Sequence, residues 1–422
     1  MSVAARAAMF GGQDAAKPLA PVGGGGAPGS GGGKSGDYHT LKLDEHTKRP
    51  QAVTCVAVNK DGTRFAFSPS NNEVHIVAWD GAAFSPVAVL REHDQRVTAL
   101  DWAPESNMLV SCSQDRNAYV WKEVGGVWKP SLVHLRLNRA ATYCKWSHSE
   151  KKFAVCAGDK SVAVCYYEAE EDWWISKVVD GFESTVLTAA WDQSDTVLAA
   201  GSSDGTVRLF TAALKSVDNK PAQLFGPDVS FKKMGVPFCE VRTDAWVNDV
   251  CFSPSGDTLA YVTHDSRIHF LTVVHGAPPD PSSVQSVRCS GLPHHRLLFV
   301  EDDKVIAAGH DLNPTAYVRR GGVWSEGGKL DDSKAGKASV SAGASARSAA
   351  FKKFEMSSTQ GTEGGAVASA VATRHQNCIS DLATCVAWGA PNKCRQVVSV
   401  GLDGRLCMWD LSVEAAMAAL KL

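Results

Sequence analysis

Short apolar segments recur along the chain, and hydrophobic and polar positions alternate within them. The alternation is clear in VTALDW (97–102) and AYVW (118–121), while NKDG (59–62), SSDG (202–205) and SPSG (253–256) are typical turn sequences. A period of two indicates β-strands with one apolar face, and Asn, Asp and Gly tolerate the backbone angles that tight turns require. The pattern therefore predicts an all-β protein.

The strand-like segments belong to an internal repeat that is marked by an aspartate. In four copies a bulky residue lies 13 positions before the Asp, and another apolar or Cys residue lies 6 positions after it. The four markers are Asp115, Asp159, Asp204 and Asp265. Looser copies are centred on Asn72, Asp311 and Asp403, which makes seven copies in all.

The spacing of the markers predicts the architecture. Successive markers are 43, 44, 45, 61, 46 and 92 residues apart, and a period near 44 is the length of a WD repeat, which forms one four-stranded blade of a β-propeller. Because one blade cannot bury its apolar face alone, the copies must stack around a ring, which also hides the sheet edges. We therefore predict a seven-bladed WD-repeat β-propeller over residues 38–422, closed by pairing of Thr40–Leu43 with the last blade.

Three segments do not fit the repeat. Residues 1–37 hold 11 of the 37 glycines and predict a flexible tail. The interval of 61 residues places a long loop at about 211–245, between the fourth and fifth blades. The interval of 92 places a larger insertion at about 326–377, before the seventh blade; it is rich in Ala, Gly and Ser, and we expect it to be largely mobile.

Charge and cysteine content narrow the class of protein. The 43 Lys and Arg against 45 Asp and Glu give a net charge of −2, without the basic excess of a dedicated nucleic-acid binder. No uncharged apolar run approaches the roughly 18 residues that span a bilayer, and the N-terminus lacks the apolar core of a signal peptide. The 12 cysteines include no CxxC pair, and Cys55, Cys112, Cys251 and Cys407 lie in apolar runs. We expect a reduced, cytoplasmic protein with no membrane span and no nucleic-acid partner.

The repeated aspartates suggest either catalysis or a structural role. Their constant position favours the structural role, because each carboxylate lies where the turn between the second and third strands of a blade needs hydrogen-bond acceptors. In two blades, Ser lies four positions before the Asp and Trp six positions after it. We predict two polar blade networks, formed by His93, Ser111, Asp115 and Trp121, and by His375, Ser399, Asp403 and Trp409.

Other candidate chemistry is sparse. His294 and His295 lack acidic or Cys companions at metal-ligand spacing, so we expect a surface loop and no metal site. PGSGGGKS (28–35) lacks the first glycine of a phosphate-binding loop, and neither GxSxG nor HExxH occurs. We therefore expect no catalytic residues and no cofactor. Trp173 and Trp174 are either a partner-binding hot spot or a pair of which one residue packs a blade.

The large insertion contains one segment whose sequence predicts a helix. Ala346–Glu355 holds good helix formers, and Phe351 and Phe354 fall on one face at i, i+3. Basic residues surround the two Phe: these are Arg347, Lys352 and Lys353. We predict a short helix near 346–355 that docks on an acidic groove of another protein, the alternative being that both Phe fold back on the propeller.

Several stretches carry residues that propeller geometry does not demand. They include WAPESN (102–107), DRNAYVW (115–121), LNRAA (137–141), EDWWISK (171–177) and AAGHDLNP (307–314). These stretches, in this order, resemble the family of the WD-repeat subunit, subunit 1, of the actin-related protein 2/3 complex, and the similarity extends over about residues 50–422.

The resemblance implies a non-catalytic propeller subunit in the actin cytoskeleton of the cytoplasm. Its expected partners are actin-related proteins 2 and 3, the other subunits of their complex, the actin filament and nucleation-promoting factors. The resemblance also implies a role in forming branched actin filaments, with actin contacted by the basic Phe-containing helix. The inherited contact residues are Arg347, Phe351, Lys352, Lys353 and Phe354. A generic WD-repeat adaptor and a propeller-fold hydrolase are the competing interpretations.

Overall fold

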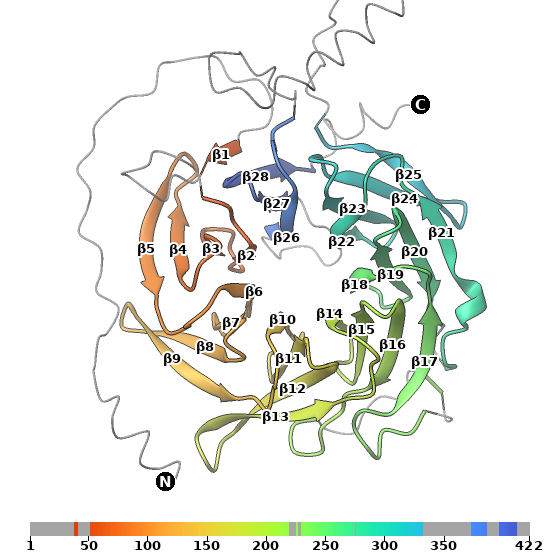
Figure 1. Ribbon diagram of the computed structural model, residues 1–422, viewed down its shortest axis with the longest axis horizontal. Coiled ribbons are helices and arrows are strands. Elements are labelled where there is room, and N and C mark those ends of the chain that lie inside the picture. The colour runs from red at the N-terminus through yellow and green to blue at the C-terminus, as the bar shows by residue number, and fades with distance from the viewer. Residues whose placement is uncertain are drawn as a thin grey trace, which may run out of the picture.

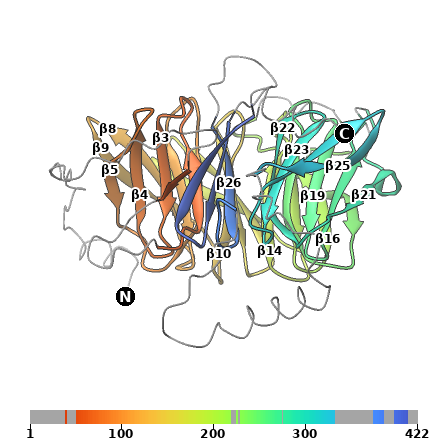
Figure 2. The ribbon, with the colours of Figure 1, turned by 90° about the horizontal axis from the view of Figure 1, so that it is seen from above.

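The architecture is a ring of four-stranded blades. A computed structural model of the chain describes residues 38–40, 51–218, 225–226, 229–274, 276–331, 373–385 and 396–411. Within these residues the only helical element is the 3₁₀ turn η1 (Pro281–Ser283), and the strands form seven blades around a central axis (Figure 1). Seen edge-on, the strands run between the two faces of a disc (Figure 2). The predicted seven-bladed propeller is confirmed.

The first three blades each use four consecutive strands, ordered from the axis outward. Blade 1 comprises β2 (Cys55–Val58), β3 (Arg64–Ser68), β4 (Val74–Trp79) and β5 (Phe84–Leu90). Blade 2 comprises β6 (Val97–Trp102), β7 (Leu109–Ser113), β8 (Ala118–Val124) and β9 (Val127–His134). Blade 3 comprises β10 (Ala141–Trp146), β11 (Lys152–Ala157), β12 (Ser161–Glu168) and β13 (Trp173–Val179).

The next three blades follow the same order, and the seventh does not. Blade 4 comprises β14 (Val186–Trp191), β15 (Val197–Ser202), β16 (Thr206–Thr211) and β17 (Pro237–Arg242). Blade 5 comprises β18 (Val247–Phe252), β19 (Thr258–Thr263), β20 (Arg267–Thr272) and β21 (Gln285–Arg288). Blade 6 comprises β22 (His294–Glu301), β23 (Lys304–Gly309), β24 (Thr315–Arg320) and β25 (Val323–Lys329). Blade 7 comprises β26 (Ile379–Cys385), β27 (Gln396–Gly401), β28 (Arg405–Asp410) and, from the other end of the chain, β1 (Tyr38–Thr40).

The hydrophobic core lies between the blades. Each pair of neighbouring blades shares one cluster of buried side chains, including the pair formed by blades 7 and 1. Between blades 2 and 3, for example, Val110 and Val120 pack with Trp146 and Phe153, whose ring centroids are 4.9 Å apart. Alternation along each strand therefore supplies one apolar face to each neighbour, as expected for repeats that cannot bury their faces alone.

The ring is closed by β1, which pairs antiparallel with β28. Tyr38 lies opposite Cys407 and Thr40 opposite Arg405. The predicted closure by the N-terminal segment therefore occurs, but it uses Tyr38–Thr40. The remainder of the predicted segment, 41–43, lies outside the described residues.

The long loop predicted at about 211–245 lies within that range, but inside blade 4 and not between blades 4 and 5. Residues 237–242 form β17, the outer strand of blade 4, so the extra residues belong to the connection between β16 and β17, inside that blade. Lys152 anchors this connection, because its buried ammonium group donates to Asp218 at 2.5 Å and to the carbonyl of Ala212 at 3.1 Å. The second predicted insertion begins later than expected, because β25 extends to Lys329. Residues 1–37 and 332–372, including the predicted helix, lie outside the described part of the chain.

Candidate functional site

The four residues predicted to form a network in blade 2 lie together. His93 precedes β6, and its Nδ1 lies 2.9 Å from Oδ2 of Asp115 in the turn between β7 and β8. Its Nε2 lies 2.8 Å from Oγ of Ser111, and the Trp121 indole donates a 2.9 Å hydrogen bond to the same Oγ. Because an ionised carboxylate only accepts, Nδ1 of His93 is the donor to Asp115. The network thus connects the turn to the second and third strands of the blade.

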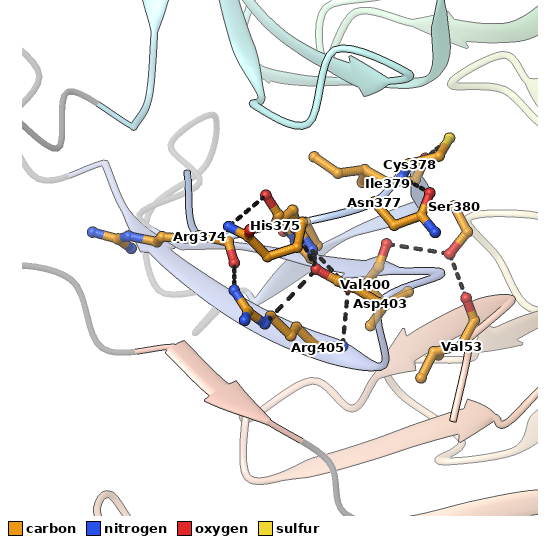
Figure 3. A network of polar contacts seen from close by, with 12 residues as sticks. Val53, Arg374, His375, Asn377, Cys378, Ile379, Ser380, Val400, Asp403 and Arg405 are labelled. Atoms are coloured by element: carbon orange, nitrogen blue, oxygen red, sulfur yellow. Dashed lines mark hydrogen bonds and ion pairs between the residues drawn. The ribbon is translucent and has the colours of Figure 1, made fainter. Parts of the chain in front are cut away.

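Blade 7 repeats this arrangement. Nδ1 of His375 lies 3.2 Å from both carboxylate oxygens of Asp403, and its Nε2 lies 2.7 Å from Oγ of Ser399. The Trp409 indole donates to the same Oγ at 2.7 Å. Figure 3 shows His375 beside Asp403, with Arg405 on the other side of the carboxylate.

The acids of blades 2, 3, 4 and 7 also tie each turn to the connection that enters the blade. Asp115 accepts from the backbone N–H of Asp94 at 2.9 Å, and Asp403 accepts from that of Gln376 at 2.7 Å. Asp159 accepts from Asn138 at 2.8 Å, and Asp204 from Glu183 at 2.9 Å. The constant position of these carboxylates therefore corresponds to a constant backbone contact.

Blades 5 and 6 depart from this arrangement. Asp265 accepts from the hydroxyl of Thr263 at 2.5 Å, and Asp311 pairs with the ammonium group of Lys329 at 2.6 Å. Here the marker aspartate still lies in the turn between the second and third strands, but its partners are side chains of its own blade.

Hydrogen bonding keeps two of the turn aspartates ionised. Burial alone would raise the pKa of Asp115, but the hydrogen bond and charge of His93 and two backbone amides hold it below its ordinary value. The same balance, with His375 as the main partner, lowers the pKa of Asp403. Each carboxylate is therefore an acceptor whose lone pairs are already occupied, as a structural role requires.

A second group of charges lies at the ring axis. Arg296 of β22 is buried, and its Nε lies 3.2 Å from Oδ1 of Asp381 in β26. Its Nη1 lies 3.8 Å from Oδ1 of Asp249 in β18. The guanidinium also lies 4.8 Å from the ring centroid of Tyr143 in β10, which faces β22 across the axis (Figure 1). One side chain thus connects blades 3, 5, 6 and 7.

The two carboxylates of this axial cluster also accept backbone hydrogen bonds from the next blade. Asp249 accepts from the N–H of Leu297 in blade 6 at 3.0 Å, and Asp381 accepts from that of Val56 in blade 1 at 3.0 Å. Burial raises the pKa of Asp381 to about 6, against the opposing effects of Arg296 and the Val56 amide. Burial likewise raises the pKa of Asp249. The axial cluster therefore joins neighbouring blades.

Sequence reasoning missed the axial cluster, although a signal was present. Three innermost strands carry a charged residue at their third position: Arg296, Asp249 and Asp381. At this position the register with the second strand of the same blade shifts. Three charged residues at the same position of three innermost strands could have indicated side chains that meet at the axis.

The sequence predicts a surface loop for the two adjacent histidines, and this prediction is wrong because both lie in β22. His294 begins β22 and is buried, and its Nε2 lies 2.8 Å from the hydroxyl of Tyr317. Burial lowers the pKa of His294 to about 4, so the ring is neutral near pH 7. Among the described residues no group of three or more His, Cys, Asp and Glu side chains is placed to hold a metal ion.

The two adjacent tryptophans have different environments. Trp174 is buried, with its ring centroid 5.6 Å from that of Trp146 and 5.3 Å from that of Phe153. Trp173 is 54% exposed and stacks on His134 at 4.6 Å. One of the pair therefore packs the blade, and the other is available at the surface.

The predicted actin-contact residues lie outside the described part of the chain. They are Arg347, Phe351, Lys352, Lys353 and Phe354. The described part also includes no helix long and apolar enough to cross a bilayer.

Comparisons with known proteins agree with the repeat pattern. A family model described as WD domain, G-beta repeat matches residues 84–122 and 174–211. The chain is 38% identical over 376 residues to Actin-related protein 2/3 complex subunit 1A-B of Xenopus laevis, an alignment that covers 88% of this chain and 98% of the relative.

Plant and fungal relatives give the same result. Identity is 38% over 365 residues to Actin-related protein 2/3 complex subunit 1A of Arabidopsis thaliana, covering 86% of this chain and 94% of the relative. It is 35% over 370 residues to Actin-related protein 2/3 complex subunit 1 of Schizosaccharomyces pombe, covering 84% and 96%. The similarity therefore includes nearly the whole length of each relative.

Proposed function

The chain belongs to the actin-related protein 2/3 complex subunit 1 family, and we propose that it is the non-catalytic WD-repeat subunit of such a complex. The observation that carries this proposal is the similarity to Xenopus, plant and fungal relatives, each named as subunit 1 of that complex and covered over 94 to 98% of its length. A shared propeller alone would not assign a function, because one fold serves many functions.

The described structure supports a scaffold role. The turn aspartates that a hydrolase would need as acids or bases accept hydrogen bonds from backbone amides and buried side chains. The carboxylates at the ring axis are shared with Arg296 and with amides of neighbouring blades. The turn acids stabilise individual blades and the axial acids join neighbouring blades, and the proposed partner contacts lie on the outer surfaces.

The proposal includes the partners expected from the sequence. In it, the chain joins actin-related proteins 2 and 3 and the other subunits, and links the complex to the mother filament and to nucleation-promoting factors in the cytoplasmic actin cytoskeleton. The contact with actin is assigned to the segment near 346–355, where Phe351 and Phe354 are flanked by basic residues. A basic segment with two Phe on one face suits an acidic groove with an apolar floor.

A branching assay with reconstituted complex tests this proposal. Complex assembled with the wild-type chain is expected to form branches on preformed filaments in the presence of an activator, and the subassembly without the chain is expected to form few. Equal branch density with and without the chain would remove the proposed role.

The same assay tests the assigned actin contact. Phe351→Ala with Phe354→Ala is expected to lower branch density about tenfold, the size of effect seen when an aromatic anchor is truncated. Melting of the isolated chain and recovery of the complex serve as controls, and both are expected to match the wild type. Wild-type branch density in a fully assembled double variant would contradict the assignment.

A further inference from the structure

The turn between β12 and β13 carries an acidic cluster at the outer edge of blade 3. Glu170, Glu171 and Asp172 are exposed, and Glu168 is half-buried at the end of β12. Glu168, Glu170 and Glu171 form no ion pair with any residue that the structure describes, whereas Asp172 accepts a hydrogen bond from Tyr167. Four acids in five positions therefore present negative charge to the solvent.

An exposed aromatic surface lies directly beside these acids. Trp173 is 54% exposed, and one face of its ring stacks on His134 with an interplanar angle of 21°. Leu132, 46% exposed, directly precedes Val133, which pairs with Trp174 where β9 and β13 run parallel. Glu168 pairs directly with Trp173 across β12 and β13. We name Leu132, His134, Glu168, Glu170, Glu171 and Trp173 the Trp173 patch.

The backbone beneath the Trp173 patch is held rigidly. β13 pairs with β12 in its own blade and with β9 of blade 2, so the outer strands join two blades into one eight-stranded sheet. The hydroxyl of Ser176 donates to the carbonyl of His134 at 2.9 Å across this junction. Below it, Trp174 packs into the core between the two blades. An aromatic ring on such a support loses little conformational entropy when a partner binds.

We propose that the Trp173 patch binds a basic segment of a neighbouring subunit, with an Arg or Lys of that segment lying on the free face of Trp173 and pairing with Glu170 and Glu171. The inference rests on the proposed function, since it names the chemistry of one subunit contact. Unpaired carboxylates select a cationic partner, and an indole face attracts a guanidinium or ammonium group. Leu132 adds apolar area for the aliphatic part of the same side chain.

Binding to the purified subassembly that lacks this chain tests the proposal. We compare the affinity of the wild-type chain with that of Trp173→Ala and of Glu170→Lys with Glu171→Lys, at low and moderate salt. Each variant is expected to bind at least about tenfold more weakly, and the charge variant is expected to lose part of the salt dependence. Trp246→Ala is the matched control, because Trp246 is 57% exposed and lies in the connection between β17 and β18; its affinity is expected to stay within about twofold of wild type.

Photo-crosslinking identifies the occupant of the Trp173 patch. With Glu171→p-benzoylphenylalanine in the assembled complex, the expected product is a cross-link to a peptide of another subunit that carries Lys or Arg at or next to the attachment site. Affinities within twofold of wild type for both Trp173 patch variants, or cross-links only to acidic or uncharged segments, to actin or to a second copy of this chain, would overturn the inference. If the wild-type chain itself fails to bind the subassembly, the proposed function fails, and the assigned occupant fails with it.

Discussion

Aspartates in this propeller occupy two environments that shift their pKa in opposite directions. Asp115 and Asp403 lie in turns where histidine and backbone amides favour the ionised form, so the pKa of each is lowered. Asp381 lies at the ring axis, where burial outweighs the attraction of Arg296 and raises its pKa to about 6. Similar side chains therefore make opposite contributions to stability as the pH changes.

Replacing a turn aspartate should destabilise its blade. Asp115→Ala leaves His93 and the backbone N–H groups of Asp94 and Asn117 without their acceptor, so we expect a loss of about 1 to 3 kcal/mol in the free energy of unfolding. Urea denaturation followed by tryptophan fluorescence measures this. Glu92→Ala, at an exposed neighbouring position, should change stability by less than about 0.5 kcal/mol. Equal midpoints for the two variants would count against the network.

The raised pKa of Asp381 predicts a distinct pH dependence. A carboxyl group with a folded pKa of about 6 binds a proton more readily in the folded chain than in the unfolded chain. Its contribution to stability is therefore complete below about pH 4 and is lost as the pH rises through about 6, by up to about 3 kcal/mol. The charged and titratable groups that interact with it include Arg296, Asp249, Lys145, Tyr143 and the thiol of Cys55.

The slope of stability against pH isolates this effect from any change in packing. Between pH 7.5 and pH 5, Asp381 should add stability to the wild-type chain as the pH falls, and Asp381→Asn should lose this component because its side chain does not titrate. The buried, neutral His294 makes the opposite contribution, and it does so equally in both chains. Below about pH 4, Asp115 and Asp403 lower the stability of both chains, since the lowered pKa of each makes its contribution disappear as the pH falls through it. A slope in Asp381→Asn equal to that of the wild type would contradict the raised pKa.

The contacts of the turn aspartates could be predicted from the sequence, and the axial contacts of Arg296 could not. Ser111, Asp115 and Trp121 lie within 11 residues of one another, so their spacing reveals a contact between adjacent strands. Arg296 meets Asp249 and Asp381 from blades on either side, 47 and 85 residues away in the chain. Such contacts depend on the curvature of the ring and on the register shift in each innermost strand, which spacing alone does not contain.

At the scale of elements, each sequence repeat begins one strand earlier than the blade that it mainly forms. The matched segment 84–122 begins in β5, the outer strand of blade 1, and ends in β8 of blade 2. The segment 174–211 likewise begins in β13 of blade 3 and ends in β16 of blade 4. Each repeat thus connects two blades, and the ring closes only when β1 supplies the outer strand of blade 7.

Removing β1 should weaken the closed ring. Deletion of residues 1–40 removes the pairing of three residues with β28, and we expect a loss of roughly 2 to 4 kcal/mol, at about 1 kcal/mol for each hydrogen-bonded residue pair. Deletion of residues 1–37 keeps β1 and is the matched control. Thermal unfolding of the two truncated chains measures the difference, and identical melting temperatures would show that β1 does not stabilise the ring.

The position of the extra loop in blade 4 could not be read from the marker spacing. An interval between two marker aspartates contains both the connection between the third and fourth strands of one blade and the connection to the next blade. Because Asp204 and Asp265 lie at the same phase, a longer interval does not say which of the two connections has grown. Recognition of PFCEVR (237–242) as an outer strand would have decided it, but this strand carries none of the marker residues.

At the scale of the whole molecule, buried apolar clusters and axial ion pairs hold the seven blades together. Apolar clusters fill every interface between blades, and Arg296 connects four blades at the axis. In the proposed account, the Trp173 patch on blades 2 and 3 and the segment near 346–355 after blade 6 provide two contacts at different positions around the ring.

Purification of the tagged chain from its own cells at moderate salt, with mass spectrometry of its stoichiometric partners, tests the central claim most directly. The account predicts recovery of two actin-related proteins together with the other subunits of one complex, each in about equal amount with this chain. Recovery of cullin adaptors or chromatin proteins in their place would contradict membership in the complex, while the seven-bladed fold would stand.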